Sequence, residues 1–190
     1  MTLALALPLT LALTLGLPPG LGSLVPFTSG AEPSPARPAD KPPPNADEQI
    51  DRAVVKLQRG FMAGDFTPAV ELLYGPLVEK MGGRDRALAA ARGINEQMKA
   101  RQVVFVSWQA RKPYQYLASP SRRYAIVPTE ARLRIGARRE VQGSYLLGIE
   151  RPGGRWEFIN GDKLNPQVYQ ELFPDFPKGP ALPKVTRTVE

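Results

Sequence analysis

The spacing of apolar residues changes near residue 102, and this change limits the possible folds more than any other feature. Before it, Ile50, Val54, Leu57 and Phe61 recur every three or four residues, the period of a helix that buries one face. After Gln102 the run VVFVSWQA is rich in β-branched and aromatic residues, which favour strands. Helices followed by strands with short turns predict an α+β fold with segregated layers.

Three helices are expected before the sheet. Asp47 and Glu48 suit the positive end of the first helix dipole. Thr67 and Pro68 suit the start of the second helix, which Gly75-Pro76 breaks or kinks. The expected helices are 47–63, 67 to about 82, and 84–101; the expected strands are 103–110, 122–135, 138–150 and 155–160, followed by a helical turn at 166–172.

The first thirty-one residues carry no charged side chain, and TSGA at 28–31 offers the small residues of a signal-peptidase site. We therefore expect residues 1–31 to be a signal peptide, so that the protein is exported to the periplasm or the cell exterior and begins near Glu32. A retained membrane anchor is the alternative, because the uncharged stretch is long enough to span a bilayer. Contact with a membrane is expected only in that case.

Proline sets the boundaries of the folding unit. Residues 32–45 hold six prolines in fourteen positions and are expected to be an extended linker. Residues 174–190 carry prolines at 174, 177, 180 and 183, so we expect a tail that forms neither a helix nor a central strand. The folded domain is therefore expected to span 46–173.

The chain contains neither cysteine nor histidine. Their absence excludes thiol nucleophiles, disulfides, histidine triads and zinc sites with nitrogen or sulfur ligands. Lys and Arg number 25 against 18 Asp and Glu, and the net charge of +7 favours either anionic neighbours or simple solubility. The basic residues are scattered, and no glycine-rich phosphate loop joins a strand to a helix. We expect no nucleic-acid partner and no cofactor.

Acidic residues are most dense at Asp47, Glu48 and Asp51. A Ca²⁺ or Mg²⁺ site needs clustered acidic ligands, but this group lies at the start of a helix and is better explained as capping. No metal site is predicted.

Three local patterns support a resemblance: LVEKMGG at 77–83, YAIVP at 124–128 and RWEFING at 155–161. With the order of elements, they resemble the nuclear transport factor 2-like superfamily, in particular its small exported bacterial members. The resemblance covers about 46–160 and implies a curved sheet of about four or more strands, closed by the three helices into a cone with a pocket. Some relatives are isomerases or dehydratases, and many only bind ligands or partners. Asn160 stands where the resemblance would suggest Asp.

Successive strand residues point to opposite faces of a sheet. The faces expected to point inward carry no carboxylate and no lysine, whereas Glu157 is expected to point outward. Pro128 leaves open whether Tyr124 and Ile126 or Ala125 and Val127 lie inside. The other expected inward residues are Thr129, Ala131, Leu133, Ile135, Tyr145, Leu147, Ile149, Trp156, Phe158 and Asn160.

The large and polar side chains of this face define the candidate site. General acid–base catalysis needs a positioned titratable group, and an unassisted phenol is a poor base near neutral pH. No catalytic residue is therefore predicted. The candidate pocket-lining residues are Trp108, Tyr124, Tyr145, Trp156 and Asn160.

Three functions remain open. The first is an exported, non-catalytic domain that binds a small apolar or amphipathic ligand or a cell-envelope partner. The second is an enzyme of the isomerase or dehydratase type, with a pocket tyrosine and a carboxylate from outside the inward faces. The third is a structural module that forms a homodimer and fills its pocket with its own side chains.

Overall fold

A computed structural model describes residues 42–164, 166–177 and 182–190. They belong to the second of the two compact units into which the chain divides, Pro33–Glu190. The expected signal peptide and residues 32–41 of the expected linker lie outside the described residues. The helices are α1 (Ala46–Ala63), α2 (Thr67–Glu71), α3 (Gly75–Lys80), α4 (Arg84–Ala100), the 3-10 turn η1 (Gly161–Lys163) and α5 (Pro166–Leu172). The strands are β1 (Val103–Ala110), β2 (Gln115–Ala118), β3 (Arg123–Ile135), β4 (Arg138–Arg151), β5 (Arg155–Asn160) and β6 (Thr186–Val189).

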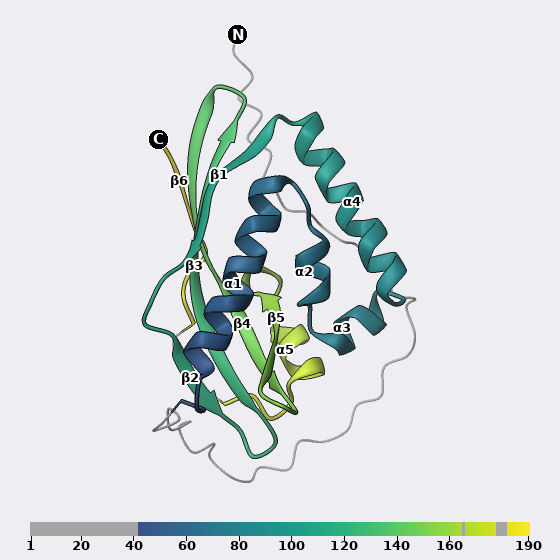
Figure 1. Cartoon of the computed structure of the whole chain (residues 1–190), viewed down its shortest axis with the longest axis vertical. Coiled ribbons are helices and arrows are strands. Elements are labelled where there is room, and N and C mark those ends of the chain that lie inside the picture. Colours follow the sequence, from purple (N-terminus) through teal and green to yellow (C-terminus); the bar gives the residue numbers. More distant parts are fainter. Residues whose placement is uncertain (1–41, 165, 178–181) are drawn as a thin grey trace, which may run out of the picture. The chain divides into compact units, whose positions relative to one another are not determined.

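The strands form one antiparallel sheet in the order β1-β3-β4-β5. β2 pairs with the first part of β3, and β6 pairs with the first part of β4. The sheet curls into a half-barrel, and α1 lies across one of its faces (Figure 1). The expected α+β class with a curved antiparallel sheet is confirmed.

The helical region contains four helices rather than the three expected. The expected second helix is divided into α2 and α3, because residues 72–74 leave the helical path and bond to β5. Phe158 donates its N–H to the carbonyl of Leu72, and Tyr74 donates its N–H to the carbonyl of Phe158. Pro76 then occupies the first turn of α3, where its missing N–H costs nothing.

α4 packs on the other helices more than on the sheet. Val70 from α2 and the α4 residues Ala87 and Ala91 form a small core with Phe66 and Met81 at its edge. Only two residues of this long helix are buried. α4 therefore forms an outer layer over α2 and α3, and it leads through a tight turn into β1.

Each face of the sheet is buried over part of its area, and a different part of the chain covers each face. The α1-side core joins the buried stripe of α1 to one face of the sheet. Its buried members are Ala46, Ile50, Val54, Leu57, Trp108, Ala125, Val127, Leu146, Trp156 and Phe158. The α5-side core joins the opposite face to α5 and the segment after it. Its buried members are Tyr74, Leu117, Tyr124, Ile126, Tyr145, Leu147, Ile149, Ile159, Leu172 and Phe173.

Strand register decides one open alternative and corrects one prediction. β3 and β4 pair without a shift at Pro128, and the bulge lies at Val106 in β1 instead. Ala125 and Val127 therefore share the α1 side with Thr129 and Ala131. The prediction that Tyr145, Leu147 and Ile149 share a face with Trp156 and Phe158 is wrong, since Leu146 opposes Asn160 and Gly148 opposes Phe158.

The folded part extends beyond 46–173 at both ends. Pro43 is buried, and its carbonyl accepts a hydrogen bond from Ala46 N–H. In the segment expected to be a tail, Phe176 packs against the α5-side core, and β6 adds a short edge strand beside β4. None of the helices in the described part of the chain is long and apolar enough to cross a membrane.

Candidate functional site

The five predicted pocket residues do not meet in one place. Trp108 and Trp156 lie in the α1-side core, whereas Tyr124 and Tyr145 lie in the α5-side core across the sheet. Asn160 is exposed at the end of β5, where it accepts a hydrogen bond from Ser144 Oγ at 3.2 Å. Their expected proximity depended on a face assignment that the register of β4 with β5 overturns.

A carboxylate does lie beside Tyr124. Asp175 accepts hydrogen bonds from Ser119 Oγ at 2.7 Å, from Ser121 Oγ, and from the Tyr124 hydroxyl at 3.3 Å. The bond from Ser121 leads the contributions that lower the pKa of Asp175, against the opposing effect of burial. Burial and the charge of Asp175 raise the pKa of Tyr124 to about 12. Both groups therefore keep their ordinary protonation states near neutral pH and join the chain after α5 to the β2–β3 turn.

Tyr145 is enclosed by its neighbours. Its hydroxyl lies 3.3 Å from that of Tyr169. Its ring packs so close to Gly161 that a Cβ there would come within 2.4 Å of ring carbons. Burial, followed by the contact with Tyr145, raises the pKa of Tyr169 far above its ordinary value. Packing by the described residues of the α5-side core therefore leaves Tyr145 only 3% exposed.

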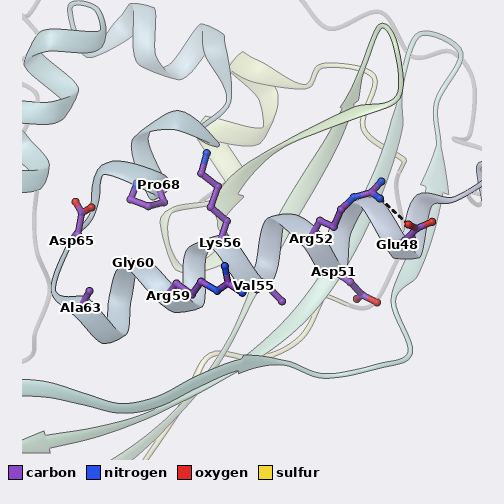
Figure 2. A pocket seen from close by; sticks show the side chains of 10 residues that line it. All are labelled: Glu48, Asp51, Arg52, Val55, Lys56, Arg59, Gly60, Ala63, Asp65 and Pro68. Carbon is purple, nitrogen blue, oxygen red and sulfur yellow. Dashed lines mark hydrogen bonds and ion pairs between the residues drawn. The ribbon is translucent and has the colours of Figure 1, made fainter.

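Two open concavities border the exposed side of α1. The first, here called the α1 groove, has a volume of about 740 Å³ and follows the helix from its first turn to the start of α2 (Figure 2). Its described lining is Glu48, Asp51, Arg52, Val55, Lys56, Arg59, Gly60, Ala63, Asp65 and Pro68.

A second groove, here called the hairpin groove, has a volume of about 540 Å³ and lies between α1, the end of α2 and the β4–β5 hairpin. Its described lining is Gln49, Arg52, Ala53, Lys56, Glu71, Leu72, Gly153, Gly154, Arg155, Trp156 and Glu157. Arg52 and Lys56 line both grooves, which therefore form one continuous region that we call the α1 surface.

Charges of both signs cover the α1 surface. Arg52 bonds to Glu48 at 2.7 Å, and Lys56 pairs with Glu71 at 2.7 Å. The hydrogen bond and charge of Lys56 lower the pKa of Glu71. Val55 adds an apolar side chain that is 41% exposed. Exposed ion pairs of this kind add little to stability, so these side chains are available for a partner.

Trp156 is the inward boundary of the hairpin groove. It is 5% exposed, and its indole N–H finds no acceptor among the residues that the structure describes. A buried donor without an acceptor costs about 1–3 kcal/mol, so such groups are rare and call for an explanation. Trp156 was one of the predicted pocket-lining residues, and it borders the hairpin groove from the α1-side core.

A polar cluster fixes the first turns of α1 to the sheet. Tyr114 donates its hydroxyl to Asp51 at 2.6 Å, Tyr116 donates to Asp47, and Lys112 bonds to Asp51 at 2.8 Å. Asp47 and Asp51 were interpreted as capping residues, but their side chains contact β2 and the loop before it. The alternating tyrosines of PYQY were the sequence signal for this contact, because residues two apart in a strand point to the same face.

The pKa shifts of this cluster do not prepare a proton transfer. Burial raises the pKa of Tyr114 and Tyr116 well above that of a free phenol, and their carboxylate partners raise it further. Burial opposes the hydrogen bonds of Lys112 and Tyr114 at Asp51, but those bonds prevail and lower its pKa. Tyr114, Tyr116 and Asp51 are therefore held in the protonation states that they have in water at neutral pH. The cluster is therefore a set of structural contacts rather than a catalytic centre.

A third hollow, of about 440 Å³, lies between the β2–β3 turn and the β4–β5 hairpin. Its arginines are already engaged. Arg123 bonds to Glu150 at 2.9 Å, and Arg122 bonds to the Tyr74 hydroxyl at 3.1 Å and to the Leu172 carbonyl at 3.0 Å. The described residues contain no group of three acidic side chains that could hold a metal ion.

Comparison with family models, with curated proteins and with solved structures finds no match to this chain. The features of the molecule that bear on its function are therefore the α1 surface and the two buried cores.

Proposed function

We propose that this chain is an exported, non-catalytic binding domain of the nuclear transport factor 2-like kind, and that its α1 surface takes a segment of a cell-envelope partner. Export is the expectation drawn from residues 1–31. The curled sheet with α1 across one face is compatible with the resemblance stated above.

The observation that carries the proposal is the contrast between a filled interior and an open α1 surface. The aromatic residues expected to line an internal pocket are packed into the two cores. The concavities beside α1 are open, charged at their rims and large enough for several side chains of a partner. A surface that alternates charge with an exposed valine suits a polar peptide segment better than an apolar small molecule.

The enzyme alternative loses support because shifted groups near the tyrosines are stabilised in their ordinary forms. A general base works best with a pKa near the operating pH. Instead, the pKa values of Asp51 and Asp175 are lowered, and those of Tyr114, Tyr116 and Tyr124 are raised.

A small amphipathic ligand in the hairpin groove is a second candidate, favoured by the buried Trp156 N–H, for which the described part of the chain offers no acceptor. Such a ligand would supply a carbonyl or carboxylate oxygen to this donor. Ligand binding would then shift the Trp156 indole N–H resonance while that of Trp108, the other tryptophan, stays in place.

Site-specific photo-crosslinking in the source cells tests the leading proposal. A photoreactive amino acid replaces Val55 in the α1 groove, and a matched control replaces Ala89, which is exposed on α4. We expect a discrete heteromeric adduct from position 55 and none from position 89. Reversing the charges of Arg52 and Lys56 should weaken the adduct about tenfold or more, equivalent to about 1.4 kcal/mol of binding free energy.

Equal labelling at positions 55 and 89 would overturn the proposal. So would labelling at position 55 that stays the same when the charges of Arg52 and Lys56 are reversed. An adduct of twice the chain's own mass would instead support the homodimer alternative. Melting curves of the variants serve as the folding control, since exposed substitutions change stability by only about 0.5 kcal/mol.

A further inference from the structure

The face of the sheet that α5 covers continues past Tyr145 as an area whose side chains are mostly exposed in the described part of the chain. Residues on this face of β3 and β4 include Arg132, opposite Val141, and Arg134, opposite Arg139. Val104 of β1 lies opposite Arg134 on the other side of β3. The bulge turns Val106 to the outside as well. We call this area the outer patch; its members are Val104, Val106, Arg132, Arg134, Arg139 and Val141.

The outer patch combines exposed apolar side chains with exposed guanidinium groups. Val104 is 45% exposed and Val106 is 52% exposed, although β-branched residues in a two-layer fold usually point into a core. Arg132, Arg134 and Arg139 are also exposed. The combination lies on the side of the sheet opposite α1, so it is separate from the α1 surface.

Two arginines of the patch face each other without a counter-charge. Arg134 and Arg139 are directly opposed on neighbouring strands, and neither guanidinium group has an ion pair or a hydrogen bond with another described residue, although the Arg139 carbonyl accepts a hydrogen bond from Glu190 N–H. Like charges opposed across a sheet are destabilising. Arg132 differs, because Glu190 lies 3.5 Å and Glu130 lies 3.7 Å from its guanidinium. An anion between Arg134 and Arg139 would relieve their repulsion.

The side chains of the outer patch favour some anionic partners over others. Single-stranded nucleic acids need aromatic side chains for base stacking, and the patch has none. A second copy docked on the same patch would bring further arginines close to Arg134 and Arg139. Valines beside arginines instead match the boundary of a bilayer, where phosphate groups lie next to acyl chains.

We infer that the outer patch is a contact site for a membrane surface that contains anionic lipids. Arg134 and Arg139 bind lipid phosphate groups, and Val104 and Val106 reach the upper part of the acyl chains. This contact belongs to the folded domain and needs no retained membrane anchor. It leaves the α1 surface facing away from the membrane and free to bind a partner.

A fluorescent probe at one position tests the inference in the full chain. Because the chain has no cysteine, Val106→Cys carries a single environment-sensitive dye, and Ala89→Cys on α4 is the matched control. Each labelled protein is mixed with vesicles of phosphatidylcholine, with and without phosphatidylglycerol. We expect a blue shift of the dye at position 106 with phosphatidylglycerol vesicles alone, and no shift at position 89.

Charge variants make the test specific. The double substitution Arg134→Gln with Arg139→Gln should raise the lipid concentration that gives half of the maximal response about 30-fold, or roughly fivefold for each arginine. The control pair, Arg86→Gln with Arg92→Gln, removes the same charge from exposed positions of α4 and should leave the response unchanged.

Five outcomes would overturn the inference: no shift at position 106, an equal shift with uncharged vesicles, an equal shift of the dye at position 89, an equal loss in both arginine pairs, or a concentration-dependent shift without vesicles. The last would assign the patch to a second copy of the chain. A dye at position 89 that responds as strongly as the one at 106 would show a non-specific contact.

Discussion

Gly161 shows how closely single residues are packed around the candidate tyrosines. A Cβ at this position would lie 2.4 Å from carbons of the Tyr145 ring, closer than real Cβ contacts. Tyr145 cannot retreat, because it is 3% exposed within the α5-side core. Gly93 on the exposed part of α4 is the opposite case, with no atom within 4 Å of its added Cβ.

The pair gives a residue-scale prediction. Gly161→Ala should lower the free energy of unfolding by about 1–3 kcal/mol, the usual effect of overpacking. Gly93→Ala should raise it by about 0.5–1 kcal/mol, because alanine favours the helix and restricts the unfolded chain. Chemical denaturation measures both. A neutral Gly161→Ala would mean that the Tyr145 ring has room to move, as it would in a ligand pocket.

At the scale of elements, β6 depends on one buried charge. Glu140 is 5% exposed, and it accepts hydrogen bonds from Arg187 of β6 and from Gln142. Burial raises the pKa of Glu140, but the bonds from Arg187 and Gln142 and nearby positive charge outweigh it, so the pKa falls below the ordinary value of 4.5. The residues of β6 themselves are all exposed, so little apolar burial holds the strand in place.

The lowered pKa predicts that β6 detaches in acid. A carboxyl group whose folded pKa lies below its unfolded pKa stabilises the fold above the unfolded value, and this contribution disappears as pH falls through the folded value. Amide-exchange protection of Thr186–Val189 should therefore fall as pH drops below 4.5, the ordinary value. Glu140→Gln should show weaker protection at neutral pH and a smaller acid-dependent loss. Equal acid dependence in both proteins would contradict the assignment to Glu140.

Local sequence signals predicted most elements but not their interruptions. The apolar spacing in α1 and the β-branched run of β1 carry their own periodicity, so both were placed within one residue of their observed bounds. The break between α2 and α3 depends instead on hydrogen bonds to Phe158, far along the chain. β6 follows four prolines and pairs with a distant strand, so its local composition did not indicate it.

At the scale of the whole domain, the candidate pocket residues were expected to lie together, and there is a physical reason why they do not. The segment SYLLGIE carries apolar residues at both parities, so alternation alone cannot say which set faces α1. Only the pairing of Leu146 with Asn160 decides it, and register is a long-range property. The sequence did identify buried residues, since Trp108, Tyr124, Tyr145 and Trp156 all lie in cores. These residues were expected around one pocket because the prediction gave the sheet only one buried face.

Because the chain packs a core on each face of the sheet, we expect a partner or a membrane to bind at the outer surface of the domain. The α1 surface and the outer patch lie on opposite sides of the sheet. The α1 surface carries charges of both signs, whereas the outer patch has two arginines whose side chains have no ion pair with another described residue. The proposal for the α1 surface depends on the central claim that the interior is filled by the chain itself.

The free energy of unfolding of Tyr145→Ala, measured beside Trp156→Ala, tests that claim most directly. If both rings fill close-packed cores on opposite faces, each substitution should cost about 3–5 kcal/mol, the usual loss for a large buried aromatic side chain. A residue that lines an open ligand pocket has fewer contacts to lose. A cost below about 1 kcal/mol for Tyr145→Ala would contradict the account and return the function to an internal pocket.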